Sequence, residues 1–158
     1  MLYEIIAVVF IAILGVFIGI CIRKRERPSL LDDMEGLEFE LYCADLLRRR
    51  GFEEVEVTKA SGDYGVDILA EKDGVTYGIQ CKRYATPVGV KAIQEAYAGK
   101  EYYDKMVGAV LTNQYFTKPA VEAAKKLRIL LWDRGYLDEM VLEESISSGR
   151  GNSVWNRQ

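Results

Sequence analysis

The sequence has no histidine among its 158 residues. A Ser-His-Asp or Cys-His triad, an HExxH zinc site and a histidine general base are therefore excluded. The three cysteines, Cys21, Cys43 and Cys81, have no CxxC spacing and leave one unpaired in any pairing. This argues against a zinc knuckle or a disulfide framework and favours a reducing compartment. Any catalysis must rest on carboxylates, lysine, tyrosine or a metal ion.

An excess of positive charge is also missing. The formal net charge is -3, and residues 29–148 contain 15 Lys and Arg against 22 Asp and Glu. A chain of this balance is not a general polyanion binder. Binding of nucleic acid would need a local basic patch, or metal ions that neutralise clustered carboxylates.

One long apolar run lies near the N-terminus, at residues 5–22, which carry no charge. As a helix it spans roughly 27 Å at about 1.5 Å per residue, enough to cross a bilayer. A cleaved signal peptide fits poorly, because the basic residues follow the run and do not precede it. The positive-inside rule puts the N-terminus outside and the rest of the chain in the cytoplasm. We expect a single-pass transmembrane helix within residues 1–22 and a basic linker at 23–31.

Gly15 and Gly19 within this run form a GxxxG pair, which allows two membrane helices to approach closely. A homodimer is therefore one option. Glycines are common in membrane helices generally, so the pair alone does not establish it.

The length leaves room for one ordinary domain, which we place at residues 32–144. Its first helix is expected to be capped by Asp32 or Asp33 and to end near Arg50, with an apolar face formed by Leu37, Leu41, Ala44 and Leu47. From Ser145 on, the sequence is polar and without periodicity, which predicts a disordered tail at 145–158.

The segments between predict a mixed α/β sheet with helices on both faces. Strands are expected at 54–58, at 66–72 and 75–84 around an Asp-Gly turn, at 106–112 and at 128–132. Helices are expected from Val90 to about Tyr103, at 118–127 and at 136–144. The resulting order is αβββαβ, extended by a further helix and strand.

The Asp73-Gly74 pair predicts a two-residue hairpin turn, which sets the register of its two strands. Lys72 then pairs with Val75, and Asp67 lies directly opposite Gln80. Lys82 is a diagonal neighbour on the same face, at about 7 to 8 Å. The alternate residues of the second strand, Tyr77, Ile79 and Cys81, face the other way and suit a core.

These residue types suit a divalent metal ion that acts on a phosphodiester. Mg²⁺ is usually held by one or two carboxylates and other oxygens, which Asp67, Gln80, the Cys81 carbonyl and Glu40 can offer. Lys82 can orient water or stabilise a charged transition state. The plainer alternative is that Asp67 and Lys82 are solvated strand charges and Glu40 an ordinary helix-surface residue. Asp is disfavoured in strands, which favours the functional interpretation for Asp67.

Other polar and aromatic residues allow two interpretations. Thr112 and Asn113 could contact phosphate, but loop polarity explains them as well. The Tyr102-Tyr103 pair and Trp132 suit a core or its rim better than a base-stacking platform.

Four segments together resemble the PD-(D/E)xK nucleases, and among them the Mrr-like type IV restriction endonuclease catalytic domain. They are GLEFE ending at Glu40, SGDYGVDILA around Asp67, IQCKRY around Gln80 and Lys82, and AVLTNQYFTKPA. The resemblance runs from about Gly36 to Trp132. It implies a restriction-endonuclease-like αβββαβ core, Asp67 as metal ligand, Lys82 as the motif lysine and Glu40 as the acidic residue of the helix. Gln80 takes the middle position, where most of the superfamily has Glu.

The resemblance implies DNA as substrate and Mg²⁺ as cofactor, with Mn²⁺ as a substitute. We therefore expect a membrane-anchored, metal-dependent endodeoxyribonuclease. The competing hypothesis is an inactive nuclease-fold module that binds nucleic acid or a protein partner at the membrane, and a plain membrane structural protein ranks last.

Overall fold

The computed structural model describes residues 30–58 and 64–151, with side chains given as far as Leu142. The expected membrane helix at 1–22 and the linker as far as Ser29 lie outside these residues, so they stay predictions. Within the described ranges, no helix is long and apolar enough to cross a bilayer.

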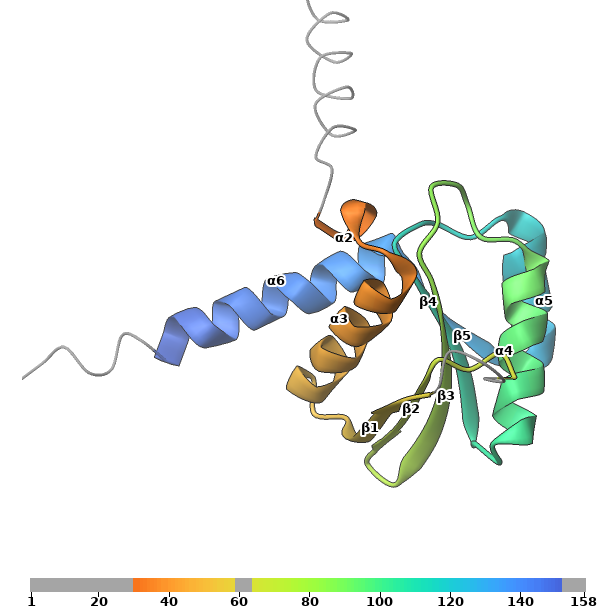
Figure 1. Ribbon diagram of the computed structural model, residues 1–158, viewed down its shortest axis with the longest axis horizontal. Coiled ribbons are helices and arrows are strands. Elements are labelled where there is room, and N and C mark those ends of the chain that lie inside the picture. Colours follow the sequence, from red (N-terminus) through yellow and green to blue (C-terminus); the bar gives the residue numbers. More distant parts are fainter. Residues whose placement is uncertain (1–29, 59–63, 152–158) are drawn as a thin grey trace, which may run out of the picture. The chain divides into compact units, whose positions relative to one another are not determined.

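A five-stranded sheet organises the domain (Figure 1). Its strands lie in chain order, β1 to β5. The first three pair antiparallel and the last three pair parallel. Their bounds are Glu53–Val57, Ile68–Lys72, Val75–Lys82, Val107–Thr112 and Ile129–Trp132. The predicted mixed sheet, a hairpin joined to parallel crossovers, is confirmed.

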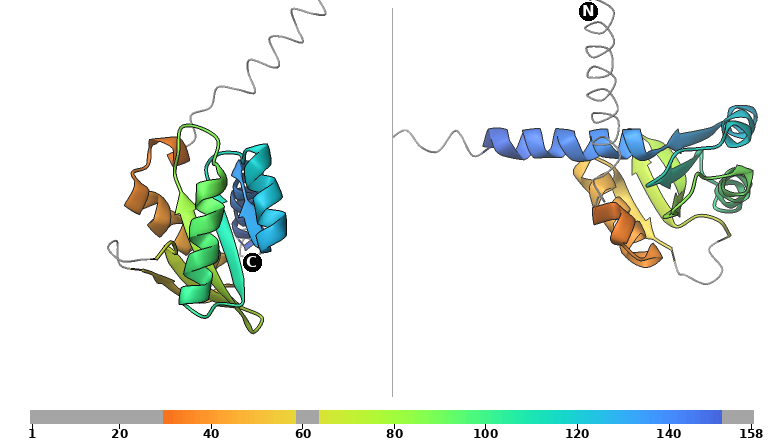
Figure 2. Two further views of the ribbon diagram at one scale, coloured as in Figure 1. Left: turned by 90° about the vertical axis from the view of Figure 1, so that its right-hand side faces the viewer. Right: turned by 90° about the horizontal axis from the view of Figure 1, so that it is seen from above.

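Helices cover both faces of this sheet, as Figures 1 and 2 show. On one face lie α3 (Gly36–Arg49), preceded by the short α2 (Leu30–Asp33), and the first turns of α6 (Arg134–Gly151). On the other lie α4 (Val90–Tyr102) and α5 (Lys118–Leu127). The sheet therefore separates two hydrophobic cores.

Strand β3 contributes to both cores by simple alternation. Ile79 and Cys81 are buried against α3, as predicted. Gln80 points the other way, because its neighbour in the parallel ladder, Val110, belongs to the core under α4 and α5. The face of β3 that carries Gln80 and Lys82 is thus the face covered by α4.

The start of α3 differs from the prediction. Asp32 and Asp33 end the separate helix α2, and α3 begins at Gly36 with Glu35 as its N-cap. The Glu35 N–H donates to the Glu38 carboxylate at 3.0 Å, half of a capping box. Asp32 is instead used in tertiary contacts, since its carboxylate accepts from Arg134 at 2.9 Å. A nearby tertiary partner overrides a local capping preference here.

The predicted apolar face of α3 is also partly wrong. Leu37 and Leu41 are 57% and 50% exposed, whereas Phe39 and Cys43 are fully buried. Both pairs have the same i, i+4 spacing, so periodicity alone allows two stripes. Ala44 and Leu47 lie in the core as expected, and the pair buried beside them is Phe39 and Cys43.

The C-terminal prediction needs a similar correction. Helix α6 continues to Gly151, seven residues beyond the helix expected at 136–144 and into the tail expected to be disordered. No proline interrupts this stretch, and each added residue of a helix gains one backbone hydrogen bond. Residues 152–158 lie outside the described ranges.

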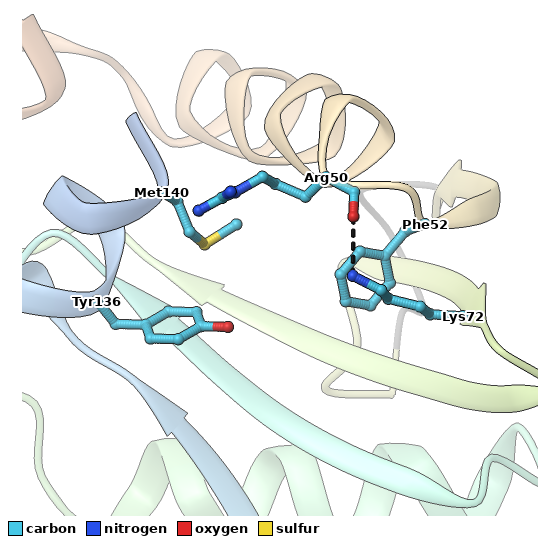
Figure 3. A pocket seen from close by; sticks show the side chains of 5 residues that line it. All are labelled: Arg50, Phe52, Lys72, Tyr136 and Met140. Carbon is cyan, nitrogen blue, oxygen red and sulfur yellow. Dashed lines mark hydrogen bonds between the residues drawn. The ribbon is translucent and has the colours of Figure 1, made fainter. Parts of the chain in front are cut away.

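A cavity of about 230 Å³ lies on the α3 and α6 face (Figure 3), lined by Arg50, Phe52, Lys72, Tyr136 and Met140. The Lys72 ammonium donates to the Arg50 carbonyl at 2.8 Å and lies 4.9 Å from the centre of the Phe52 ring. A cation beside the last carbonyls of a helix is favourable, so Lys72 stabilises the end of α3.

Candidate functional site

The predicted hairpin register is confirmed. Lys72 pairs with Val75 and Ile68 pairs with Ile79, around a turn in which Asp73 and Gly74 have φ of 52° and 77°. One residue before the strand, the Asp67 N–H donates to the Ile79 carbonyl at 2.9 Å. Asp67 therefore lies beside Gln80 at the fork where β2 and β3 begin to diverge.

Asp67 is buried and held by several hydrogen bonds. It is 6% exposed, and its carboxylate accepts from the Cys81 N–H at 2.6 Å and from the Gln80 side-chain amide. Its carbonyl accepts from the Thr58 N–H at 2.9 Å. The carboxylate thus replaces the strand partner that the Cys81 N–H lacks at the fork.

Gln80 is 3% exposed, and its two polar atoms differ in their surroundings. The amide nitrogen donates to Asp67 and, at 3.5 Å, to the Cys81 carbonyl. The oxygen Oε1 is buried and accepts no hydrogen bond. An unpaired buried acceptor costs about 1 to 3 kcal/mol. Turning the amide over would set its oxygen against the Asp67 carboxylate, so the hydrogen-bond pattern supports this orientation.

Lys82 extends from the same face of β3 and meets a carboxylate from α4. Its Nζ lies 2.9 Å from Oε2 of Glu95, and the two side chains are 18% and 30% exposed. Burial lowers the pKa of Lys82, but the hydrogen bond and charge of Glu95, with smaller effects of Tyr84 and Asp67, outweigh it and raise the pKa. Lys82 is therefore an ammonium at neutral pH, suited to stabilising negative charge and not to accepting a proton.

Glu95 was not identified from the sequence. A signal was present, because Glu95 adjoins the buried positions Ala92 and Ala96 of α4 and so lies at the edge of the helix face that meets the sheet. A carboxylate at such an edge needs a partner more often than one on the outer face. Which strand would supply that partner depends on tertiary packing, which a helical pattern alone does not give.

The loop before Asp67 packs against α4 close to Glu95. Gly65 has a φ of +87°, and a Cβ there would lie 2.5 Å from the Glu95 carbonyl oxygen. A Cβ on Gly99, one turn further along α4, would lie 2.7 Å from the Tyr64 carbonyl oxygen. Only glycines allow this approach. It fixes the loop that carries Asp67 relative to the helix that carries Glu95.

Glu40 lies on α3, across the sheet from the face of Gln80 and Lys82, and is half-buried. The pKa of Cys81 is raised, first by its hydrogen bond with Cys43 and by burial, and then by its electrostatic interactions with Cys43, Asp67 and Glu40. Glu40 is thus close enough to the fork to act on Cys81. Its role as a metal ligand stays a prediction, as do those of Asp67, Gln80 and the Cys81 carbonyl.

Thr112 and Asn113 are buried, and their side chains form hydrogen bonds with other residues of the protein. Asn113 donates to Asp32 at 2.8 Å and accepts from the Tyr84 N–H at 2.9 Å, while the Thr112 hydroxyl accepts from Gln114. The structural interpretation of both residues is favoured over a phosphate contact.

The oxygen donors at the fork suit a hard divalent cation. No group of three or more His, Cys, Asp and Glu side chains suited to a metal occurs in the described ranges. A cation here would therefore use Asp67 with neutral oxygens, of which the unpaired Gln80 Oε1 is the clearest. The residues fit a weakly held ion such as Mg²⁺, which keeps several waters when bound.

Comparison with solved structures supports the fold assignment. One similar structure is the protein of unknown function AF1548, with 26% identity and a TM-score of 0.53 over 61% of this chain and 57% of the other. Another is the DNA modification-dependent restriction endonuclease AspBHI, with 17% identity and a TM-score of 0.53 over 70% of this chain and 31% of the other. The chain thus spans 57% of the first structure and 31% of the second. No curated protein is similar enough to match.

The family profile described as restriction endonuclease, Mrr_cat, matches residues 31–141. This range contains the whole sheet, α3 to α5, the Asp67 and Gln80 fork and the Lys82–Glu95 pair. The chain therefore belongs to the Mrr_cat family of restriction endonucleases.

Proposed function

We propose that this protein is a divalent-metal-dependent endonuclease that hydrolyses DNA phosphodiester bonds at the fork between β2 and β3. The observation that carries the proposal is the unpaired, buried Gln80 Oε1 beside the Asp67 carboxylate. A free acceptor next to a buried anion is costly in an isolated protein and favourable in one that binds a cation.

Asp67 and Gln80 Oε1 would hold the metal ion, with the Cys81 carbonyl and Glu40 as further candidate ligands. When bound, Mg²⁺ or Mn²⁺ would supply Lewis-acid polarisation of the phosphoryl oxygen and lower the pKa of a water ligand. Lys82, kept protonated by Glu95, would stabilise the negative charge that develops on the phosphate. Glu95 would set the position of the ammonium relative to the metal ligands.

The distribution of charge supports DNA as the substrate despite the negative total. Residues 82–128 contain nine Lys and Arg against four Asp and Glu, whereas residues 31–81 contain five against thirteen. The first range contains β4 and the helices α4 and α5, which cover the face of the sheet that carries Lys82. A phosphate backbone would approach from this basic side.

We further propose that residues 5–22 anchor the chain in a membrane, with the nuclease domain in the cytoplasm. The support is the uncharged apolar run and the basic residues that follow it. A protease-protection assay on membrane vesicles tests this. Protease should degrade the domain when it acts from the cytoplasmic side of the membrane and leave it intact when it acts from the other side.

The activity can be tested on supercoiled DNA with the full chain in detergent, in Mg²⁺, in Mn²⁺ and in EDTA. Nicking or linearisation is expected only with a divalent ion, and Asp67→Ala and Lys82→Ala should each abolish it. Cleavage that survives both substitutions would remove this site from consideration.

One observation favours a second function, an inactive nuclease fold that binds DNA or a protein partner. Gln80 is neutral where a second carboxylate would hold the metal more tightly. This alternative predicts that neither Mg²⁺ nor Mn²⁺ raises the melting temperature, since an ion that binds only the folded state would raise it.

A further inference from the structure

Two exposed tyrosines form a stacked pair beside the candidate active site. The rings of Tyr64 and Tyr102 lie with their centroids 3.7 Å apart and an interplanar angle of 19°. Each residue is 56% exposed, and neither belongs to the hydrophobic cores of the described domain. Tyr103 meets Tyr102 edge-on at 5.0 Å. The sequence favoured a core or rim position for Tyr102, and the structure places it on the surface.

The backbone keeps this pair close to the candidate active site. Tyr64 lies three residues before Asp67, a chain reach of at most about 11 Å. Tyr102 lies seven residues after Glu95 on one helix, about 10.5 Å along its axis. The contacts of Gly65 and Gly99 lock loop and helix together between these points. Tyr64 itself has a φ of 49°, an uncommon conformation for a non-glycine residue.

The surroundings of the pair suit a nucleic-acid strand. Lys100 comes from the same turn of α4, and its ammonium contacts the Glu101 carboxylate and lies 5.7 Å from the Tyr97 ring, which is 39% exposed. Two lysines lie further along this side of the sheet, Lys91 on α4, at 88% side-chain exposure, and the half-buried Lys118 on α5. Aromatic faces among cations are typical of surfaces that bind unpaired bases.

We propose that Tyr64 and Tyr102 form a stacking platform for an unpaired base of the DNA substrate. The proposal rests on the proposed nuclease function and adds the substrate class. In an intact duplex both faces of each base are covered by neighbouring bases, so a ring platform can only take a base that is single-stranded, bulged or flipped out. Because the Cα atoms of Tyr64 and Asp67 lie within about 11 Å of each other, at about 3.4 Å per stacked nucleotide that base would lie a few nucleotides from the scissile phosphate.

Binding without cleavage tests the platform separately from the activity. The full chain in detergent would be titrated in EDTA against labelled single-stranded DNA, a duplex with a bulge and a perfect duplex, by fluorescence anisotropy. The variants are Tyr64→Ala/Tyr102→Ala and Tyr64→Phe/Tyr102→Phe. Tyr136→Ala is the control, because Tyr136 is also exposed and stacked, on Trp132 on the opposite face.

Wild type should prefer single-stranded and bulged DNA. The double alanine variant should lose about 5- to 150-fold in that affinity, the equivalent of one stacked base, while the double phenylalanine variant and Tyr136→Ala keep it. Equal affinity for all three DNAs, or an unchanged double alanine variant, would overturn the platform. A change of oligomeric state in place of DNA affinity would overturn it too, since the patch would then be a protein contact.

The two proposals fail in different ways. If the tyrosines determine single-strand affinity but no metal ion supports cleavage, the platform stands and the nuclease function fails. If the protein cleaves intact duplex through Asp67 and the tyrosine variants behave as wild type, the nuclease function stands and the platform fails.

Discussion

The ammonium of Lys82 lies 2.9 Å from the carboxylate of Glu95, which joins the strand that carries Gln80 to the helix on the same side of the sheet. The two residues lie thirteen positions apart in sequence. It also places a carboxylate in the site that lies outside the PD-(D/E)xK pattern. Glu95 is therefore the residue whose substitution is most informative about how the lysine works.

Glu95→Gln should reduce cleavage about 10- to 100-fold without removing metal binding. Burial alone lowers the pKa of Lys82, and Glu95 is the largest of the contributions that raise it. Loss of Glu95 should thus lower this pKa, so that Lys82 loses its proton, and the enzyme its activity, at a lower pH than in wild type. The rate of cleavage measured from neutral to alkaline pH checks this.

A merely structural role for Glu95 would lower the rate equally at every pH. Glu95→Asp should restore part of the activity and move the pH at which activity falls back toward the wild-type value. The matched control is Glu122→Gln, an exposed glutamate on α5.

Gln80→Glu should strengthen metal binding and lower the stability of the metal-free protein against unfolding. The new carboxylate would lie buried against Asp67, and both burial and like charge raise its pKa above that of the unfolded chain. The folded state then binds protons more readily than the unfolded state, so the loss of stability should grow as pH rises above about 4.3. Melting temperatures with and without Mn²⁺ test both statements, and a metal-induced rise no larger than that of wild type would contradict the assignment of Gln80 as a ligand.

Gly65→Ala should destabilise the domain more than Gly74→Ala. Both glycines have positive φ, at +87° and +77°, so both substitutions carry the cost of about 1 to 2 kcal/mol for that conformation. Only at Gly65 would the Cβ also meet backbone, 2.5 Å from the Glu95 carbonyl oxygen, while Gly74 has nothing within 4 Å. Urea unfolding midpoints measure the difference, and equal losses would show that the loop is not pressed against α4.

The hairpin was predictable because its signals are local. The Asp73-Gly74 pair selects a two-residue turn, and the alternation along β3 decides which side chains meet the core. These two facts together bring Asp67 opposite Gln80 and put Lys82 on the same face. The helix α5, with Thr117 as N-cap and Pro119 in its first turn, was predictable for the same reason.

The features that were missed all depend on contacts between distant segments. The capping residue of α3 could not be chosen because Asp32 bonds to Arg134, about a hundred residues away. Its buried stripe was ambiguous because Phe39 and Leu37 fit a helical period equally well. Glu95 was missed because only the packing of α4 against β3 brings it to Lys82.

The most direct test of the account is a single titration of DNA cleavage against Mn²⁺, with wild type and Asp67→Asn side by side. Asparagine keeps the shape of Asp67 and an acceptor for the Cys81 N–H, so the fold should survive. The account predicts a rate that rises with Mn²⁺ to saturation and vanishes in EDTA for wild type, and a loss of at least about 100-fold in Asp67→Asn. Cleavage by wild type in EDTA, or an unchanged rate in Asp67→Asn, would contradict it.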